Sequence, residues 1–472
     1  MDLKEIITRL SVFFLPGAVL IVTILAVSLL IYKFRMGKGG VSSSGGHRKK
    51  QIITGSLLAG YLFLVFGLTN LSRGDAYTGS INLSLFSGYI DAWNAYSLIA
   101  FQLIVFNIIM FMPLGVLLPL FHSRFKKLYW TMAASFGVTL FIEIFQFTTG
   151  RGIFELDDIF HNTLGGVIGY QLYLFVYSVY KDRRITLKSF IKYLSIPIIF
   201  TVAFVSMLTY YHAKEFGNMS INPTYGTDMS NVALSTTIEL SSNSVFAPVY
   251  KNKYSNNKEH GRSMAELIGK SLKLPELSSE GRDGENVQYS YKEEAGTRYY
   301  MTYFVQDGTW YLSDDNFNYE EVLATQSEEM EGYAETILTT LDMLPKQAEL
   351  SITDDGVFRW SMERSSYPKE DIEDGQIMMS LKKDGTVGSL IYNRTENEFV
   401  REVELLSTAE AFEKIREGKF DQMIPFQKGD QLIITQYKLA YMYDSKGYYQ
   451  PVYHFSGTLN GEEWAQFVTA IR

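Results

Sequence analysis

The first 211 residues contain six long apolar segments, and no other feature restricts the fold as strongly. Each segment is long enough to cross a hydrocarbon core of ~30 Å as a helix, the form that satisfies its own backbone hydrogen bonds in lipid. A single such segment is also compatible with a buried helix of a soluble protein, but six in succession favour an α-helical membrane bundle. The segments lie near residues 11–32, 51–69, 98–120, 129–148, 158–180 and 193–211.

Charge divides the chain into two parts. Residues 1–211 hold 18 Lys and Arg against 9 Asp and Glu, a net charge of +9. The whole chain carries −8, so residues 212–472 carry −17. The basic residues of the first part concentrate in loops 33–50, 121–128 and 181–192. Because positively charged loops stay in the cytoplasm, we expect both termini, and the acidic second part, to lie outside the cell.

These patterns predict four regions along the chain. We expect an N-terminal transmembrane helix with a basic cytoplasmic loop at 1–50, and a helical membrane domain at 51–211. Residues 212–260 are rich in Ser, Asn, Thr and Tyr and are expected to be a linker. In residues 261–472, helix-like and strand-like stretches alternate, which predicts an extracellular α+β domain with antiparallel sheets. The chain has no cysteine, so packing alone must hold this domain together.

Polar residues interrupt the predicted membrane helices near their outer ends. Glu143 and Gln146 are three residues apart and share one helix face, and Asp158 and Asn162 are four apart on the next helix. Asn107 lies somewhat deeper in the third helix. A charged side chain at the centre of a membrane costs roughly 2.5–3.5 kcal/mol. We therefore expect Glu143 to face the bundle interior or a wet cavity.

The short external loop before the fifth helix adds further charges. Arg151 is the most plausible partner of Glu143, with Asp157 and Asp158 competing for its guanidinium. Each residue also has a structural alternative. Glu143 and Arg151 fit a salt bridge that only joins helices, Asp158 fits a helix N-cap, and Asn107 fits a hydrogen bond between helices.

Small residues in the fifth helix predict close helix packing. Gly165 and Gly169 form a G-x-x-x-G pattern, with Gly166 beside them, and such patterns let a neighbouring helix approach closely. Pro113 is expected to kink the third helix and to free backbone carbonyls near Asn107–Ile109.

Taken together, these residues resemble the VanZ family over about residues 55–180. The resemblance implies a small integral membrane protein of bacteria, often Gram-positive, whose founding member is associated with low-level resistance to the glycopeptide teicoplanin. It implies no established reaction, and the large outer domain departs from a minimal member of the family. The shared pattern comprises Asn107, Pro113-Leu114-Gly115, Glu143-x-x-Gln146, Gly150-Arg151, Asp157-Asp158, Asn162 and Gly165-Gly166-x-x-Gly169.

The outer domain carries no recognisable catalytic group. Its last unit resembles extracellular domains of the YycH/YycI type, which regulate a cell-wall sensor kinase, through a helix ending at Glu417–Phe420 and strands with Pro451-Val452-Tyr453. The acidic charge argues against nucleic-acid binding. A tyrosine-lined groove for carbohydrate or peptide stays open as an alternative.

Our leading functional hypothesis is a non-catalytic envelope protein. It would bind a lipid-linked or glycopeptide-like ligand at the outer leaflet and contribute to teicoplanin-type tolerance or envelope homeostasis, without a cofactor. The partners would be the lipid bilayer, a lipid-linked cell-wall precursor or glycopeptide, and a protein that contacts the outer domain.

Two other classes of function are weighed against this hypothesis. The first is a membrane-embedded enzyme that uses Glu143, Asp157 or Asp158 for acid–base chemistry on a lipid-linked envelope substrate, with Arg151 holding a phosphate or carboxylate. A metal-dependent version would add His161 as a ligand. The second is transport, but no inverted repeat or pair of broken helices is visible.

Overall fold

The computed structural model divides the chain into two compact units. The first comprises residues up to Lys214 apart from Trp93–Tyr96, and the second comprises those four residues and Glu215–Arg472. The structure describes residues 45–71, 80–283, 286–293, 296–317, 328–345, 348–353, 355–362, 364, 366–420, 422 and 424–472.

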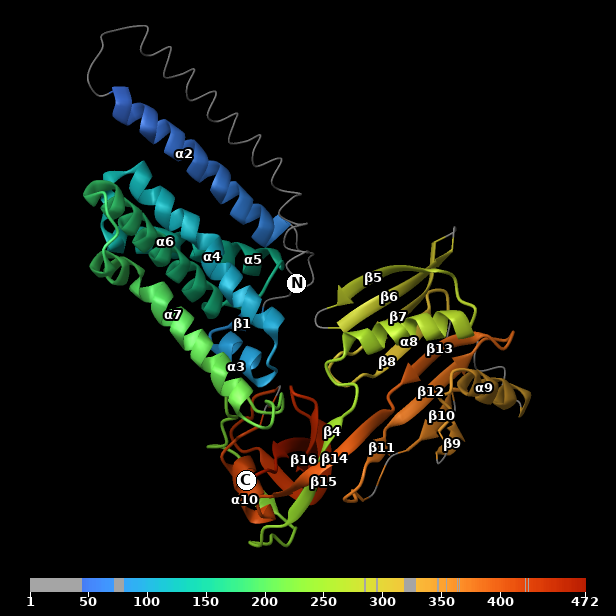
Figure 1. Ribbon diagram of the computed structural model, residues 1–472. Helices are drawn as coiled ribbons and strands as arrows, with labels where there is room; N and C mark the ends of the chain where they lie inside the picture. The colour runs from blue at the N-terminus through green and yellow to red at the C-terminus, as the bar shows by residue number, and fades with distance from the viewer. Residues whose placement is uncertain are drawn as a thin grey trace. The chain divides into compact units, whose positions relative to one another are not determined.

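The first unit is a bundle of long helices with a short helix and a two-stranded sheet at one end (Figure 1). The sheet pairs β1 with β2 in parallel, so that Ile81 lies opposite Phe154. The elements are α2 Gly45–Phe66, the π-helix η1 Gly67–Leu71, β1 Ile81–Asn82, α3 Ser87–Asn94, α4 Leu98–Phe121, the 3-10 helix η2 Ser123–Lys126, α5 Leu128–Thr149, β2 Phe154–Glu155, α6 Leu156–Asp182 and α7 Leu187–Ala213.

Among the described residues, four helices are long and apolar enough to cross a membrane: Lys50–Asn70, Leu98–Phe121, Leu128–Thr149 and Leu187–Ala213. The expected count of six is not confirmed. The segment 11–32 lies outside the described residues. The segment 158–180 is helical throughout as part of α6, but it falls short of the apolar character of the other four.

The position of α6 explains why it is less apolar. Its buried residues include Asp157, His161, Asn162 and three glycines, and these polar and small groups face other helices. A helix that meets protein along much of its length does not need the hydropathy of one that meets lipid. In α7, by contrast, no residue of the most apolar window is buried.

Helices α4 and α6 cross at very close range because glycines lie at the crossing. A Cβ atom added to Gly165 would lie 2.1 Å from the carbonyl oxygen of Ile108, and one added to Gly169 would lie 1.9 Å from that of Met112. Gly115 approaches from α4, where an added Cβ would lie 2.0 Å from the carbonyl oxygen of Gly166 on α6. The two backbones are therefore in direct contact.

Pro113 lies inside α4 without ending the helix. Because proline has no N–H, it cannot donate the helical hydrogen bond to Ile109. The carbonyl of the next residue, Met110, accepts a hydrogen bond of 2.6 Å from the hydroxyl of Tyr61 on α2. Packing of α2 against α4 thus includes a polar contact beside the proline.

The second unit contains two sheets, and the larger one is built from two consecutive units of a helix followed by four strands (Figure 1). Its strand order is β5-β6-β7-β8-β13-β12-β10-β9, so the last strands of the two repeats pair at the centre. Both helices bury residues in the same core, for example Ile268 and Leu338. The elements are α8 Lys258–Ser271, β5 Leu277–Asp283, β6 Asn286–Glu293, β7 Gly296–Tyr303, β8 Trp310–Asp314, α9 Glu328–Thr340, β9 Glu349–Ile352, β10 Phe358–Ser361, β12 Gln376–Leu381 and β13 Val387–Tyr392.

The second sheet has the order β11-β14-β4-β16-β15-β3, with β17 also paired to β16. Its pairs are antiparallel except that of β3 with β15, which is parallel. Phe412 and Ile415 of α10 pack into the core of this sheet. The elements are β3 Ala233–Thr236, β4 Phe246–Asn252, β11 Ile372–Asp374, β14 Thr395–Glu404, α10 Thr408–Arg416, β15 Gln431–Tyr443, β16 Tyr448–Leu459 and β17 Glu462–Thr469.

The segment 212–260 differs from the expected linker. It supplies β3 and β4, and β4 is a central strand whose Val249 and Tyr250 are fully buried. The reason is that β4 pairs with β14, a strand about 150 residues later, with Val249 opposite Arg401. The expected α+β class with antiparallel sheets is confirmed for the larger part of the unit.

Candidate functional site

Helix α5 carries a stripe of buried polar side chains along its whole length. They recur every three or four residues and therefore share one helix face. All are at most 2 % exposed, although the helix is apolar enough to span a membrane. Only Glu143 and Gln146 were predicted from the sequence, and the four-residue spacing of the hydroxyl groups was the signal for the rest. The stripe comprises Thr131, Ser135, Thr139, Glu143 and Gln146.

The Gln146 end of this stripe fastens the chain segments at the same end of the bundle. The Gln146 side-chain amide donates to the carbonyl oxygen of Thr69 at 2.8 Å. The backbone carbonyl oxygen of Gln146 accepts from the backbone N–H of Arg151 at 3.0 Å. Oε2 of Glu143 accepts from the backbone N–H of Glu155 in β2 at 3.0 Å. Glu143 thus holds the loop in place and also presents a carboxylate inside the bundle.

Asp157 caps a helix that is distant in sequence. Its carboxylate accepts from the backbone N–H groups of Phe86 at 2.5 Å and Gly88 at 2.8 Å, and from the hydroxyl of Ser87 at 3.3 Å. These donors form the start of α3, where a negative charge is favoured by capping and by the helix dipole. Asp157 therefore positions α3 over the end of the bundle.

Asp158 and Asn162 connect α6 to its two neighbours. Oδ1 of Asp158 accepts from the side-chain amide of Asn107 on α4 at 2.6 Å. One turn further along α6, the amide of Asn162 donates to the hydroxyl of Thr139 on α5 at 2.9 Å. The predicted residues of three helices thus form neighbouring parts of one polar layer.

Arg151 lies in the loop that follows α5. Gly150 ends the helix in the left-handed conformation with φ of 66°, which turns the chain sharply toward β2. The Arg151 side chain is half-buried. The expected ion pair between Glu143 and Arg151 stays a prediction.

Several buried polar atoms of this layer have no hydrogen-bond partner within the described part of the chain. They are Oδ1 of Asn70, the hydroxyl of Tyr89, both ring nitrogens of His161, Oδ1 of Asn162 and the hydroxyl of Thr163. Asn70, His161 and Asn162 are at most 3 % exposed. A buried polar atom without a partner costs about 1–3 kcal/mol. The layer therefore offers the carbonyl oxygens of Asn70 and Asn162 as acceptors, and hydroxyl and imidazole groups that can donate or accept, to a polar ligand.

His161 belongs to this layer, where it packs between aromatic rings. Its ring centre lies 5.0 Å from that of Tyr89 on α3 in an edge-to-face arrangement. In the sequence it entered only as a ligand of a possible metal. Within the described residues, no group of three or more His, Asp and Glu side chains is placed to hold a metal ion.

The comparisons with known proteins each concern a part of the chain. Residues 19–177 match the VanZ/LLP1 family. The match includes all residues of the polar layer described above, so the expected resemblance of this region is confirmed. The helical part of the chain is thus similar to the VanZ/LLP1 family.

Beyond this family match, the comparisons give low similarity to solved structures. No curated protein matches the chain in sequence. An uncharacterized protein from Eubacterium rectale aligns at 13% identity over 50% of this chain and 87% of its own, with a TM-score of 0.26. The C-terminal domain of Bacillus megaterium YpeB aligns at 16% identity over 44% of this chain and 92% of its own, with a TM-score of 0.19. The likeness of the last unit to YycH/YycI-type domains stays a prediction.

Proposed function

We propose that this VanZ-like protein acts in the bacterial envelope by binding the polar part of a lipid-linked or glycopeptide-like ligand in the layer around Asn162. The observation that carries the proposal is the set of buried polar atoms without a hydrogen-bond partner in the described residues, among them the acceptor oxygens of Asn70 and Asn162. Sugar hydroxyls, peptide amides and ammonium groups supply donors for these oxygens. In this proposal the binding contributes to tolerance of teicoplanin-type glycopeptides or to envelope homeostasis.

The charged residues of the layer extend the proposed site. Carboxylates of Glu143 and Asp158 accept from donors of the ligand, and the guanidinium of Arg151 grips a phosphate or carboxylate at two points. The apolar tail of such a ligand stays in the bilayer, so its polar part lies near the ends of the membrane helices, where the polar layer is.

Binding is better supported than acid–base catalysis on a lipid-linked substrate. Two of the three candidate carboxylates accept backbone hydrogen bonds, Glu143 from β2 and Asp157 from the start of α3. These two side chains therefore hold chain segments at this end of the bundle, a role that requires no proton transfer. Asp158 is the remaining candidate, and its carboxylate accepts from the side-chain amide of Asn107.

The proposal places the polar layer in the outer leaflet of the membrane and the second unit outside the cell. The loop between α4 and α5 contains Arg124, Lys126 and Lys127, which the positive-inside rule assigns to the cytoplasm. Because the chain has no cysteine, Ser123→Cys in this loop and Ser242→Cys in the second unit each introduce a single thiol. In intact cells, an impermeant thiol reagent is expected to label Ser242→Cys alone. Labelling of Ser123→Cys alone would reverse the proposed orientation.

Replacing Asn162 by leucine tests the proposed ligand site. Leucine removes the unpartnered Oδ1 of Asn162, which should raise stability, and also the hydrogen bond from Asn162 to Thr139, which should lower it. Because the two effects oppose each other, we expect the melting temperature in detergent to change little. If the proposal is right, expression of Asn162→Leu in a susceptible Gram-positive host loses the several-fold gain in teicoplanin tolerance that the unmodified protein gives.

Gln171→Leu provides a matched control. Oε1 of Gln171 is also buried without a partner, but it lies nine residues along α6, about 13 Å from Asn162. This variant is expected to keep the tolerance. Equal loss with both variants, or full tolerance with Asn162→Leu, contradicts a ligand site at Asn162, and no tolerance from the unmodified protein contradicts the glycopeptide role.

A further inference from the structure

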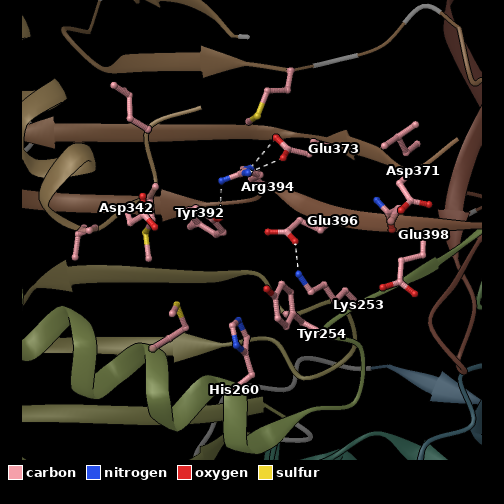
Figure 2. A pocket seen from close by; sticks show the side chains of 18 of the residues that line it. Lys253, Tyr254, His260, Asp342, Asp371, Glu373, Tyr392, Arg394, Glu396 and Glu398 are labelled. Atoms are coloured by element: carbon pink, nitrogen blue, oxygen red, sulfur yellow. Dashed lines mark hydrogen bonds and ion pairs between the residues drawn. The ribbon is translucent and has the colours of Figure 1, made fainter. Parts of the chain in front are cut away.

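The second unit contains a large open pocket of about 1170 Å³ (Figure 2). It is formed by the first half of α8, the segment after α9, the edge strand β11 and the chain from β13 into β14. Elements of both sheets thus contribute to one pocket. Pockets for drug-sized ligands have volumes of roughly 300–1,000 Å³. The volume is therefore sufficient for a ligand larger than most metabolites.

The positive charges that line this pocket are already engaged. Lys253 Nζ lies 2.9 Å from a carboxylate oxygen of Glu396. The guanidinium of Arg394 lies 2.8 Å from the carboxylate of Glu373, whose backbone carbonyl oxygen accepts from Nε of Arg364 at 2.9 Å. Figure 2 shows the first two pairs along the pocket wall. These three are the only Lys and Arg side chains of the described pocket lining.

The negative charges exceed the positive ones. Six Asp and Glu residues line the pocket against three Lys and Arg, which gives a net charge of −3. The carboxylates of Asp342, Glu349 and Glu398 are exposed and form no ion pair with any residue in the described ranges. Burial lowers the pKa of His260 from its ordinary value, so this imidazole is neutral at pH 7 and does not offset the charge. The pocket therefore attracts cations.

The base of the pocket is apolar. Leu341, Met343, Met362 and Ile372 contribute to its lining and are all at most 8 % exposed. Methionine side chains adapt their shape to different apolar groups. A cation without apolar groups would leave this surface uncovered.

One wall of the pocket is aromatic. The rings of Tyr254 and His260 are stacked, with centres 3.8 Å apart and planes 11° from parallel. Figure 2 shows both rings across the pocket from Glu396 and Arg394. The ammonium of Lys253 already lies 5.2 Å from the centre of the Tyr254 ring, so this wall offers apolar surface to a ligand. The wall, the apolar base and the free carboxylates are thus complementary to a molecule that carries both cationic and apolar side chains.

We propose that this pocket binds an extended peptide segment in which Lys or Arg residues alternate with apolar residues. The apolar side chains would cover the methionines and Ile372, while the cations would reach Glu349 and Glu398. A divalent cation fits less well, because no group of three or more His, Asp and Glu in the described residues is arranged to hold a metal ion. The proposed partner is therefore a basic segment of another protein, and the proposal does not depend on the ligand of the membrane layer.

The test uses the full chain in detergent micelles and a fluorescein-labelled, N-acetylated peptide, Lys-Leu-Lys-Leu-Lys. We expect saturable binding by fluorescence anisotropy that weakens as salt is added, because salt screens exposed charges. The double variant Glu349→Gln/Glu398→Gln is expected to bind about tenfold more weakly, since each exposed ion pair contributes up to about 1 kcal/mol. A matched control, Glu462→Gln/Glu463→Gln, removes the same charge from exposed positions on β17 outside the pocket and should bind normally.

Three further results would overturn the proposal. Equal weakening with the control variant would mean that the net charge of the unit, and not the pocket, attracts the peptide. Equal binding of Glu-Leu-Glu-Leu-Glu would exclude recognition of cations. Displacement of the peptide by spermine or Ca²⁺ at equal concentration would assign the site to a small cation.

Discussion

Replacement of Gly169 by alanine is expected to lower the stability of the helical bundle more than any other single methyl group added to α6. The new Cβ atom would lie 1.9 Å from the carbonyl oxygen of Met112, 2.8 Å from its carbonyl carbon and 3.0 Å from its Cα. All three contacts are with backbone, so no side chain can rotate to make room. Helix α4 would have to move away along its contact with α6, and overpacking of this kind costs about 1–3 kcal/mol or more. The measurement is the melting temperature of the detergent-solubilised full chain.

Gly137→Ala is the control for this experiment. Gly137 lies in α5, and an added Cβ would have no atom within 4 Å. Alanine favours a helix over glycine by about 1 kcal/mol, so this variant should be as stable as the parent or slightly more stable. If Gly169→Ala melts at the same temperature as Gly137→Ala, the close crossing of α4 and α6 does not exist in the folded protein.

The sequence could predict the features that depend on local patterns. The apolar segments that became α4, α5 and α7 could be located because a membrane helix must be long and apolar. The strand-turn-strand order of the second unit was also visible. Asp384-Gly385, for example, joins β12 to β13 with Gly385 at φ of 80°, a conformation that glycine adopts readily.

Features that depend on distant residues could not be predicted. Asp157 looked like one of several charges around Arg151, but its carboxylate caps α3, about 70 residues earlier in the chain. The polar composition of 212–260 resembled a linker, because nothing local shows that β14 will pair with β4. Similarly, Thr139 gains its role only through Asn162 on the next helix. In each case tertiary contacts supply the partner.

Glu143→Gln is expected to keep the fold and to lose function. Glutamine retains an oxygen that can accept from the backbone N–H of Glu155, so the bond that holds β2 can persist. An amide, however, neither takes up a proton as a carboxylate does nor pairs with a cationic group of the ligand. The proposed site should therefore fail while the bundle remains intact. The measurements are the melting temperature in detergent and the teicoplanin tolerance of cells that express the variant.

Glu143→Ala separates the acceptor from the charge. Alanine leaves the N–H of Glu155 without this partner, and a buried donor without an acceptor costs about 1–3 kcal/mol, so both stability and tolerance should fall. The opposite explanation is that the charge of Glu143 is needed to hold the helices together through a buried ion pair. In that case Glu143→Gln would lose about 3–5 kcal/mol of stability, because the partner would remain as an uncompensated charge. A parallel loss of melting temperature and tolerance in Glu143→Gln would thus make Glu143 a part of the scaffold, whereas loss of tolerance alone would place its charge in the ligand site.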